Sequence, residues 1–233
     1  YAPSMRRLRL RRKVALGDMQ ATAREGAPLG MMYVVETAAV GVATLMIGAF
    51  GTVALAGNQV AQSIGGLLYM LPLGVAGAVA IRVAQERGAG NVEALRPIAY
   101  AALSVAMIWL VGAALVLATQ GAAIARLITD DPEVVVVAAA IFLAFAPMQI
   151  SDGVQSAMLG ALRGLSDTMW PAAVSAIAYW VVSLPLGYVF AHHLGLGPAG
   201  IWAGFIVALA GAGAALTFRF QRKTRLLAEG TQV

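Results

Sequence analysis

The sequence contains no cysteine among its 233 residues, and only 12% of them are charged. The lack of cysteine excludes disulfides and thiolate metal sites, while carboxylate ion sites remain open. Soluble domains carry about one-quarter charged and about one-half apolar residues, whereas 60% of this chain is hydrophobic. The composition therefore excludes a water-soluble domain and predicts an integral membrane protein.

Motifs of the common enzyme chemistries are also lacking. No nucleotide-binding glycine loop, nucleophile triad or zinc signature is present, so we expect neither an enzyme nor a cofactor. A net charge of +5 could indicate nucleic acid, but the basic residues form short clusters at the edges of apolar runs rather than one continuous face. We therefore expect membrane lipid, and no nucleic acid, around this chain.

Six apolar stretches are each long enough to cross a bilayer, which takes about 20 residues. We expect helices, because unpaired backbone groups are too costly in hydrocarbon and the stretches lack the alternation of barrel strands. The predicted fold class is all-α, a polytopic membrane bundle of six transmembrane helices. The stretches span residues 28–50, 55–81, 97–118, 134–159, 170–190 and 199–218.

The basic residues are distributed unevenly between the two sides of such a bundle. With six spans, fifteen of the sixteen Lys and Arg residues fall on the side that holds both termini, and Arg126 falls on the other. Because cytoplasmic loops are rich in Lys and Arg, we expect both termini in the cytoplasm and a multi-pass protein of the plasma membrane, the inner membrane of a bacterium. We divide the chain into a basic cytoplasmic linker (1–25), a six-helix transmembrane lobe (26–218) and a basic cytoplasmic tail (219–233).

Small residues, prolines and tryptophans carry structural expectations. Runs of small residues such as 74–80 predict close helix packing. Pro72, Pro147 and Pro185 fall inside spans, where proline removes a backbone donor and bends a helix. Trp202 lies near the start of a span, which favours an interfacial anchor.

Only two of the eleven acidic residues, Glu36 and Asp152, lie inside spans. A charged side chain at mid-helix costs about 2.5–3.5 kcal/mol on insertion scales, and such residues are functional by default. We assign Arg163 to the loop 160–169 and expect no basic partner within any span. The sequence therefore predicts that Glu36 and Asp152 bind a coupling cation, with Na⁺ as a possible metal. The alternative is that both are protonated and only hydrogen-bond to neighbouring helices.

Polar residues share one helical face with Asp152. Gln149, Gln155 and Ser156 lie at positions i−3, i+3 and i+4 from it. Such oxygen and amide groups could coordinate a hard cation, and we predict that all three line a substrate cavity.

The surroundings of Glu36 differ in kind. Met32 and Tyr33 lie on its face at i−4 and i−3, where they form an apolar, polarizable wall with one hydroxyl. A flat organic cation could bind there through the carboxylate and the aromatic ring. Met32 and Tyr33 are therefore predicted to line the same substrate cavity.

Several segments, in order, resemble the second half of the multidrug and toxic compound extrusion (MATE) transporters. The first is GAPLGMMYVVETAAVGVATLMIGAFGTVALAGNQVA, which is similar to the start of that half. The others are GAGN, LITDDPEV, ISDGVQSAMLGALRGLSDT and YWVVSLPLGY, and the resemblance covers nearly the whole chain.

The resemblance implies one lobe of a twelve-helix, two-lobe transporter that works by alternating access. The chain would be the carboxyl-terminal lobe, and the amino-terminal lobe would come from the same chain or a second subunit. The start at Tyr1 is typical of a fragment. Glu36 and Asp152 match the glutamate and aspartate that similar family members use for cation coupling, and the resemblance leaves Na⁺ or H⁺ open.

The expected function is thus that of a secondary active multidrug efflux antiporter, which exports organic cations or amphipathic compounds in exchange for Na⁺ or H⁺. One alternative is a lipid-linked glycan flippase of the same superfamily, which would need basic residues in its cavity to meet a pyrophosphate. Another is a six-helix membrane subunit that transports nothing.

Overall fold

The computed structural model describes residues 16–230, which contain helices and no strand. Nine helical elements follow one another along this part of the chain. They are α1 (Leu16–Gly48), α2 (Thr52–Gly88), η2 (Val92–Ala94), α3 (Leu95–Arg126), α4 (Pro132–Gly164), α5 (Met169–Ala176), η3 (Ile177–Ser183), α6 (Leu184–His192) and α7 (Gly197–Ala228).

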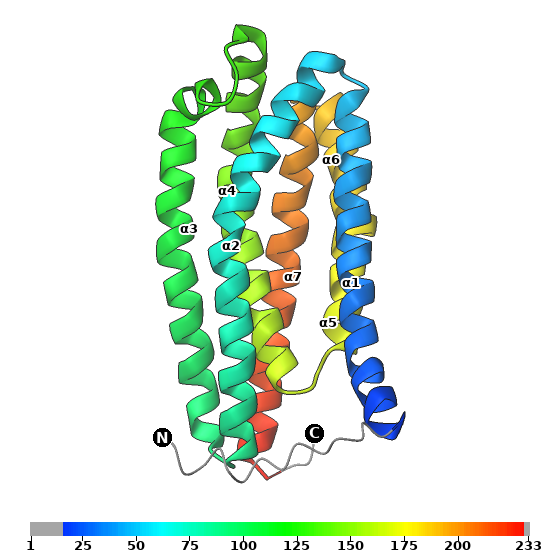
Figure 1. Cartoon of the computed structure of the whole chain (residues 1–233), viewed down its shortest axis with the longest axis vertical. Helices are drawn as coiled ribbons and strands as arrows, with labels where there is room; N and C mark the ends of the chain where they lie inside the picture. Colours follow the sequence, from blue (N-terminus) through cyan, green and yellow to red (C-terminus); the bar gives the residue numbers. More distant parts are fainter. Residues whose placement is uncertain (1–15, 231–233) are drawn as a thin grey trace.

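Six helical segments among the described residues are long and apolar enough to cross a membrane. Five of them are formed by α1, α2, α3, α4 and α7, and α5, η3 and α6 together form the remaining one, Met169–His192. They run up and down alongside one another in an elongated bundle (Figure 1). The prediction of an all-α, six-span membrane fold is confirmed.

The helices extend beyond the predicted span boundaries. Helix α1 begins at Leu16, inside the predicted linker 1–25, and α7 continues to Ala228, through most of the predicted tail 219–233. Helical hydrogen bonding does not stop where apolar residues stop, so hydropathy alone underestimates these lengths. Residues 1–15 and 231–233 lie outside the described residues, and the division into three domains stays a prediction.

The two ends of the bundle differ in charge. Arg87, Arg163 and Arg225 occupy the last turns of α2, α4 and α7, which finish at the same end of the bundle (Figure 1). Arg126 occupies the last turn of α3, which finishes at the opposite end (Figure 1). We call the first of these the basic end.

Helix α4 packs closely against α2 at positions where only a glycine fits. A Cβ atom at Gly160 would collide with the backbone carbonyl of Ala76, and a Cβ at Gly164 would lie 2.7 Å from the carbonyl oxygen of Ala80. Small residues let transmembrane backbones approach in this way. The predicted close packing is therefore present at the seam between α2 and α4.

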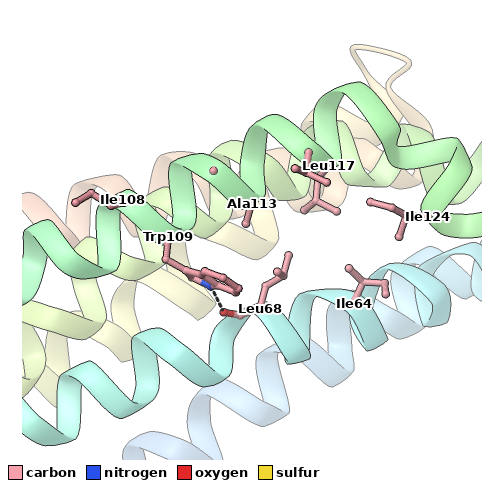
Figure 2. Close-up of a pocket in the computed structure, with 9 residues that line it drawn as sticks. Ile64, Leu68, Ile108, Trp109, Ala113, Leu117 and Ile124 are labelled. Atoms are coloured by element: carbon pink, nitrogen blue, oxygen red, sulfur yellow. Dashed lines mark hydrogen bonds between the residues drawn. The ribbon is translucent and has the colours of Figure 1, made fainter.

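Pro72 is accommodated by a side chain that donates to the carbonyl which the proline leaves free, and Pro185 lies directly after a π-helical segment. Pro72 has no N–H to donate to the carbonyl of Leu68, and the indole Nε1 of Trp109 on α3 donates to that oxygen instead, at 3.1 Å (Figure 2). Pro185 follows the π-helical segment η3, in which the Ser183 hydroxyl donates to the Ala178 carbonyl at 2.9 Å. Both spans therefore continue through their prolines.

Trp202 is buried in the core, so the prediction of an interfacial anchor is wrong. Its side chain is only 2% exposed, and its Nε1 donates to Oδ1 of the fully buried Asn58 at 2.9 Å. Its ring meets Phe145 edge-on, with ring centroids 4.7 Å apart. A buried asparagine needs a partner, and this need draws the indole inward from α7 to α2.

Candidate functional site

Glu36 and Asp152, the two acids inside spans, line the same cavity. Its volume is about 160 Å³, and α1, α2 and α4 form its walls. Both residues are partly buried. Folding thus brings together two carboxylates that lie on different helices and far apart in the sequence.

Helix α4 presents a stripe of residues to this cavity. Asp152, Ser156, Leu159 and Arg163 all line it, at positions i, i+4, i+7 and i+11. This spacing keeps side chains on one face of an α-helix. The helical periodicity of α4 therefore accounts for these four lining residues, because the helix continues to Gly164.

Arg163 supplies the cavity with a basic group, which corrects the assignment of this residue to a loop. It lies in the last turn of α4 and lines the cavity together with Glu36. A long side chain near the end of a helix leans toward the helix amino terminus and can bury its stem. A basic residue thus shares the cavity with both carboxylates, although none of the ion pairs among the described residues joins Arg163 to either of them.

Tyr69 on α2 is a second cavity residue that the sequence did not single out. It lines the cavity, and its hydroxyl shares a hydrogen bond of 3.0 Å with that of Ser156. The sequence does contain a signal for this residue, because Tyr69 is the only tyrosine in the predicted span 55–81. Its hydroxyl adds one more oxygen to the lining of the cavity.

Two cavity residues carry buried polar atoms that lack a partner among the described residues, namely Oε1 of Gln155 and Nε of Arg163. The other end of the Gln155 amide is satisfied, since Nε2 donates to the Ser175 hydroxyl on α5 at 3.0 Å. Ser175 is itself fully buried. An unpaired buried acceptor costs free energy, so the amide oxygen is available to a ligand of the cavity.

Of the other predicted cavity residues, Met32 and Tyr33 line the cavity and Gln149 does not. Met32 is buried and Tyr33 is 40% exposed. Gln149 is buried elsewhere, where its Nε2 donates to the carbonyl of Gly65 on α2 at 3.0 Å. Gln149, at position i−3 from Asp152, thus packs against α2, whereas Gln155 and Ser156, at i+3 and i+4, face the cavity.

The cavity is suited to a small cation. With both carboxylates ionised, Glu36, Asp152 and Arg163 sum to one negative charge, and oxygens of Gln155, Ser156 and Tyr69 stand nearby. Hard cations prefer oxygen ligands. The residues that line the cavity include two carboxylates and several neutral oxygens but no His or Cys, so the donor set fits a monovalent cation or a proton better than a transition metal.

A larger cavity of about 480 Å³ lies between α2 and α3, but its lining is apolar (Figure 2). Ile64 and Leu68 on α2 face Ile108, Trp109 and other residues of α3 there. It contains no ionisable group and cannot bind or release a charge. The carboxylate cavity is therefore the candidate functional site.

Comparison with known proteins gives consistent matches. The MatE family model matches residues 28–189. A probable multidrug resistance protein NorM from Xanthomonas axonopodis pv. citri is 34% identical over 213 residues, which are 91% of this chain and 46% of that protein. The multidrug resistance protein NorM of Burkholderia vietnamiensis is 36% identical over 207 residues, or 87% of this chain and 45% of that protein.

Solved structures show the same fold. The Vibrio cholerae MATE transporter VcmN in its bent form superposes with a TM-score of 0.82 at 19% identity, over 93% of this chain and 49% of that one. A MATE family transporter in an outward-facing conformation gives a TM-score of 0.85 at 16% identity, over 94% of this chain and 50% of that one. The chain thus spans about half the length of the proteins that it matches.

Proposed function

Because this chain belongs to the MatE family, the multidrug and toxic compound extrusion transporters, we propose that it forms one lobe of a secondary active multidrug antiporter. The observation that carries the proposal is the convergence of Glu36 and Asp152 on one cavity. The second lobe would come from the same chain or from a second subunit. Substrate and ion would be exchanged by alternating access between the lobes.

In the proposed mechanism, the coupling cation binds between Glu36 and Asp152. Arg163 leaves the two carboxylates with one uncompensated negative charge, which a single Na⁺ or H⁺ neutralises. The cation shifts the transporter between its conformations only to the extent that it binds them with different affinities. Its binding favours the conformation with low substrate affinity, and the substrate is released.

The substrate class that fits this chemistry is an organic cation or an amphipathic compound. Tyr33, which is 40% exposed, borders the same cavity as Glu36. An aromatic face beside a carboxylate attracts a flat cation. Met32 adds a polarizable contact that adapts to different shapes, which supports a broad substrate range.

Ethidium efflux from proteoliposomes made with the full-length protein tests the proposal. The Glu36→Gln and Asp152→Asn variants are expected to lose about tenfold or more of the ion-driven rate, since coupling between two sites is typically worth 5- to 150-fold. Glu133→Gln is the matched control, because this exposed carboxylate lies in the first turn of α4, outside the cavity. Undiminished efflux by both cavity variants would refute the assignment.

The coupling ion is tested by imposing a sodium gradient and a pH gradient separately on the same vesicles. The oxygen-rich lining supports Na⁺, and the two carboxylates support H⁺ equally well. Efflux driven by only one gradient identifies the ion. If neither gradient drives efflux although the protein still binds ethidium, the result would favour a six-helix membrane subunit that transports nothing.

A lipid-linked glycan flippase is the second candidate, and Arg163 is the observation that bears on it. A basic residue in the cavity is what a pyrophosphate requires, and Arg163 provides one. Glu36 and Asp152, however, outnumber it in the same space and repel an anion. Transfer of a fluorescent lipid pyrophosphate across vesicles, without any ethidium efflux, would decide for the flippase.

A further inference from the structure

A second polar cavity lies at the basic end of the bundle, away from the carboxylates. Its volume is about 370 Å³, and its lining residues come from the start of α3 and the last third of α7. The lining consists of Arg96, Phe218, Gln221, Arg222 and Arg225. Three of these five residues are arginines, and all three are exposed.

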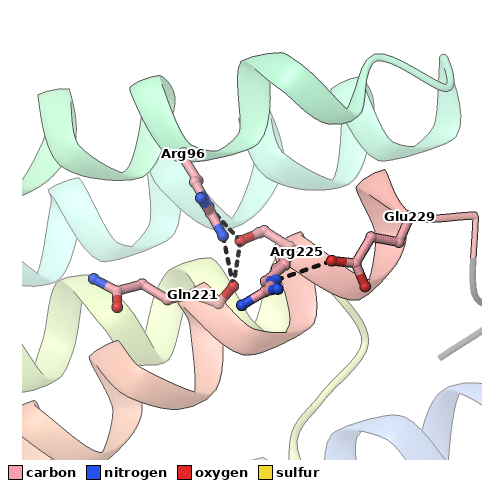
Figure 3. A network of polar contacts seen from close by, with 5 residues as sticks. Arg96, Gln221, Arg225 and Glu229 are labelled. Carbon is pink, nitrogen blue, oxygen red and sulfur yellow. Dashed lines mark hydrogen bonds and ion pairs between the residues drawn. The ribbon is translucent and has the colours of Figure 1, made fainter.

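Two of the arginines are held in place by hydrogen bonds (Figure 3). Arg96 donates through Nε to the Thr224 hydroxyl and through a terminal nitrogen to the Gln221 carbonyl, both at 2.8 Å. Arg225 donates through Nε to the Glu229 carboxylate at 2.9 Å. A guanidinium has five N–H donors, so each of the two retains donors for a ligand while its orientation is already set.

The charge of this cavity is only partly compensated by the residues that the structure describes. Glu229 is the carboxylate that pairs with Arg225, whereas Arg96 and Arg222 have no ion-pair partner among those residues. Asp167, another acid of this end, already pairs with Arg219 at 2.9 Å and with Lys223 at 3.0 Å. An anion with several acceptor oxygens would satisfy the free guanidinium groups.

The position along α7 identifies the kind of anion. Phe218, Arg222 and Arg225 are spaced i, i+4 and i+7, on one helical face, so the Cα atom of Phe218 precedes that of Arg222 by about 6 Å along the axis. Phe218 is 67% exposed and is the last residue of the apolar stretch 199–218. An apolar surface followed at once by basic groups matches an acyl chain followed by a headgroup.

We propose that Arg96, Arg222 and Arg225 bind the phosphate-bearing headgroup of an anionic phospholipid, with an acyl chain of that lipid against Phe218. Basic pockets between transmembrane helices bind acidic headgroups in this way. The site is independent of the carboxylate cavity and of the direction of transport. It gives the basic end of α7 a specific lipid partner in addition to its general attraction to an anionic membrane surface.

Native mass spectrometry of the full-length protein tests the site, with phosphatidylglycerol as the probe and phosphatidylcholine as the neutral comparison. The Arg222→Gln/Arg225→Gln variant is expected to bind phosphatidylglycerol about 30-fold more weakly, because each basic group contributes roughly a fivefold effect near an anionic lipid. Phosphatidylcholine binding should stay unchanged, which also shows that the variant is folded. Arg222→Gln alone should weaken binding about fivefold.

The matched control is Arg82→Gln/Arg87→Gln, which removes two charges from the end of α2, at the same end of the bundle and outside the cavity. It should retain the affinity for phosphatidylglycerol. Equal weakening in both double variants would overturn the proposal in favour of a general charge effect. Wild-type affinity in Arg222→Gln/Arg225→Gln, or displacement of the lipid by the same concentration of inorganic phosphate, would overturn it as well.

Discussion

At the scale of single residues, Arg163 sets the charge of the carboxylate cavity. It lines the cavity with Glu36 and Asp152, and its Nε is buried without a hydrogen-bond partner among the described residues. Buried side-chain nitrogens normally have a hydrogen-bond partner. Arg163 therefore brings both a positive charge and an unpaired N–H donor to the cavity.

If the coupling ion is Na⁺, Arg163→Gln is expected to tighten its binding about tenfold. Removal of the guanidinium leaves two carboxylates facing the cation alone, and a unit charge in a partly buried site is worth about 1–2 kcal/mol. Calorimetric titration of the full-length protein with NaCl measures the change. Arg163→Lys keeps the charge and should retain the wild-type affinity, so equal affinities in the two variants would show that the charge does not reach the site.

The sequence predicted the two carboxylates because each lies alone in an apolar span, which is a local property. That they share one cavity, and that Arg163 and Tyr69 complete it, depends on how α1, α2 and α4 pack. Helical spacing placed Gln149 beside Asp152 as readily as Gln155, yet it could not distinguish the face toward α2 from the face toward the cavity. The roles of all these residues remain predictions.

At the scale of the helices, Pro72 and Trp109 act as a pair. The indole of Trp109 replaces the N–H that Pro72 cannot donate to the Leu68 carbonyl (Figure 2). Hydropathy located both spans but could not predict this compensation, because it joins residues from two helices. The π-helical turns before Pro185 were likewise not predicted.

Trp109→Phe is expected to destabilise the wild-type protein by about 1 kcal/mol, because it leaves the Leu68 carbonyl without a donor. In a Pro72→Ala background the alanine N–H supplies that donor, so the same substitution should have a much smaller effect. A double-mutant cycle of thermal unfolding in detergent measures the coupling. Strictly additive effects would mean that the indole does not compensate for the proline.

Gly160→Ala is expected to destabilise the seam between α2 and α4 by about 1–3 kcal/mol, the range for overpacking. Its Cβ would collide with the Ala76 carbonyl, and backbone atoms cannot move aside as a side chain can. Gly211→Ala on α7 is the control, because its Cβ would meet nothing within 4 Å. It should be neutral or stabilising in the same unfolding assay, and a similar loss in both variants would contradict close packing as the cause.

At the scale of the whole molecule, the basic end is expected to face the cytoplasm. The 233 residues contain no cysteine, so single cysteines can report accessibility. Ala89→Cys, in the turn after α2, should react with a membrane-impermeant maleimide only after the cells are permeabilised. Leu127→Cys, in the turn after α3 at the opposite end, should react in intact cells, and the reverse pattern would invert the topology.

The contact of Gly160 with Ala76 has a consequence for how the carboxylate cavity can open. Two of its three walls, α2 and α4, are joined along a seam that leaves no space for a side chain. On α1, by contrast, no described glycine would bring a Cβ against the backbone of another helix. We therefore expect α1 to be the wall that moves when a cation enters or leaves the cavity. A cation bound by both Glu36 on α1 and Asp152 on α4 would then hold α1 against the other two helices.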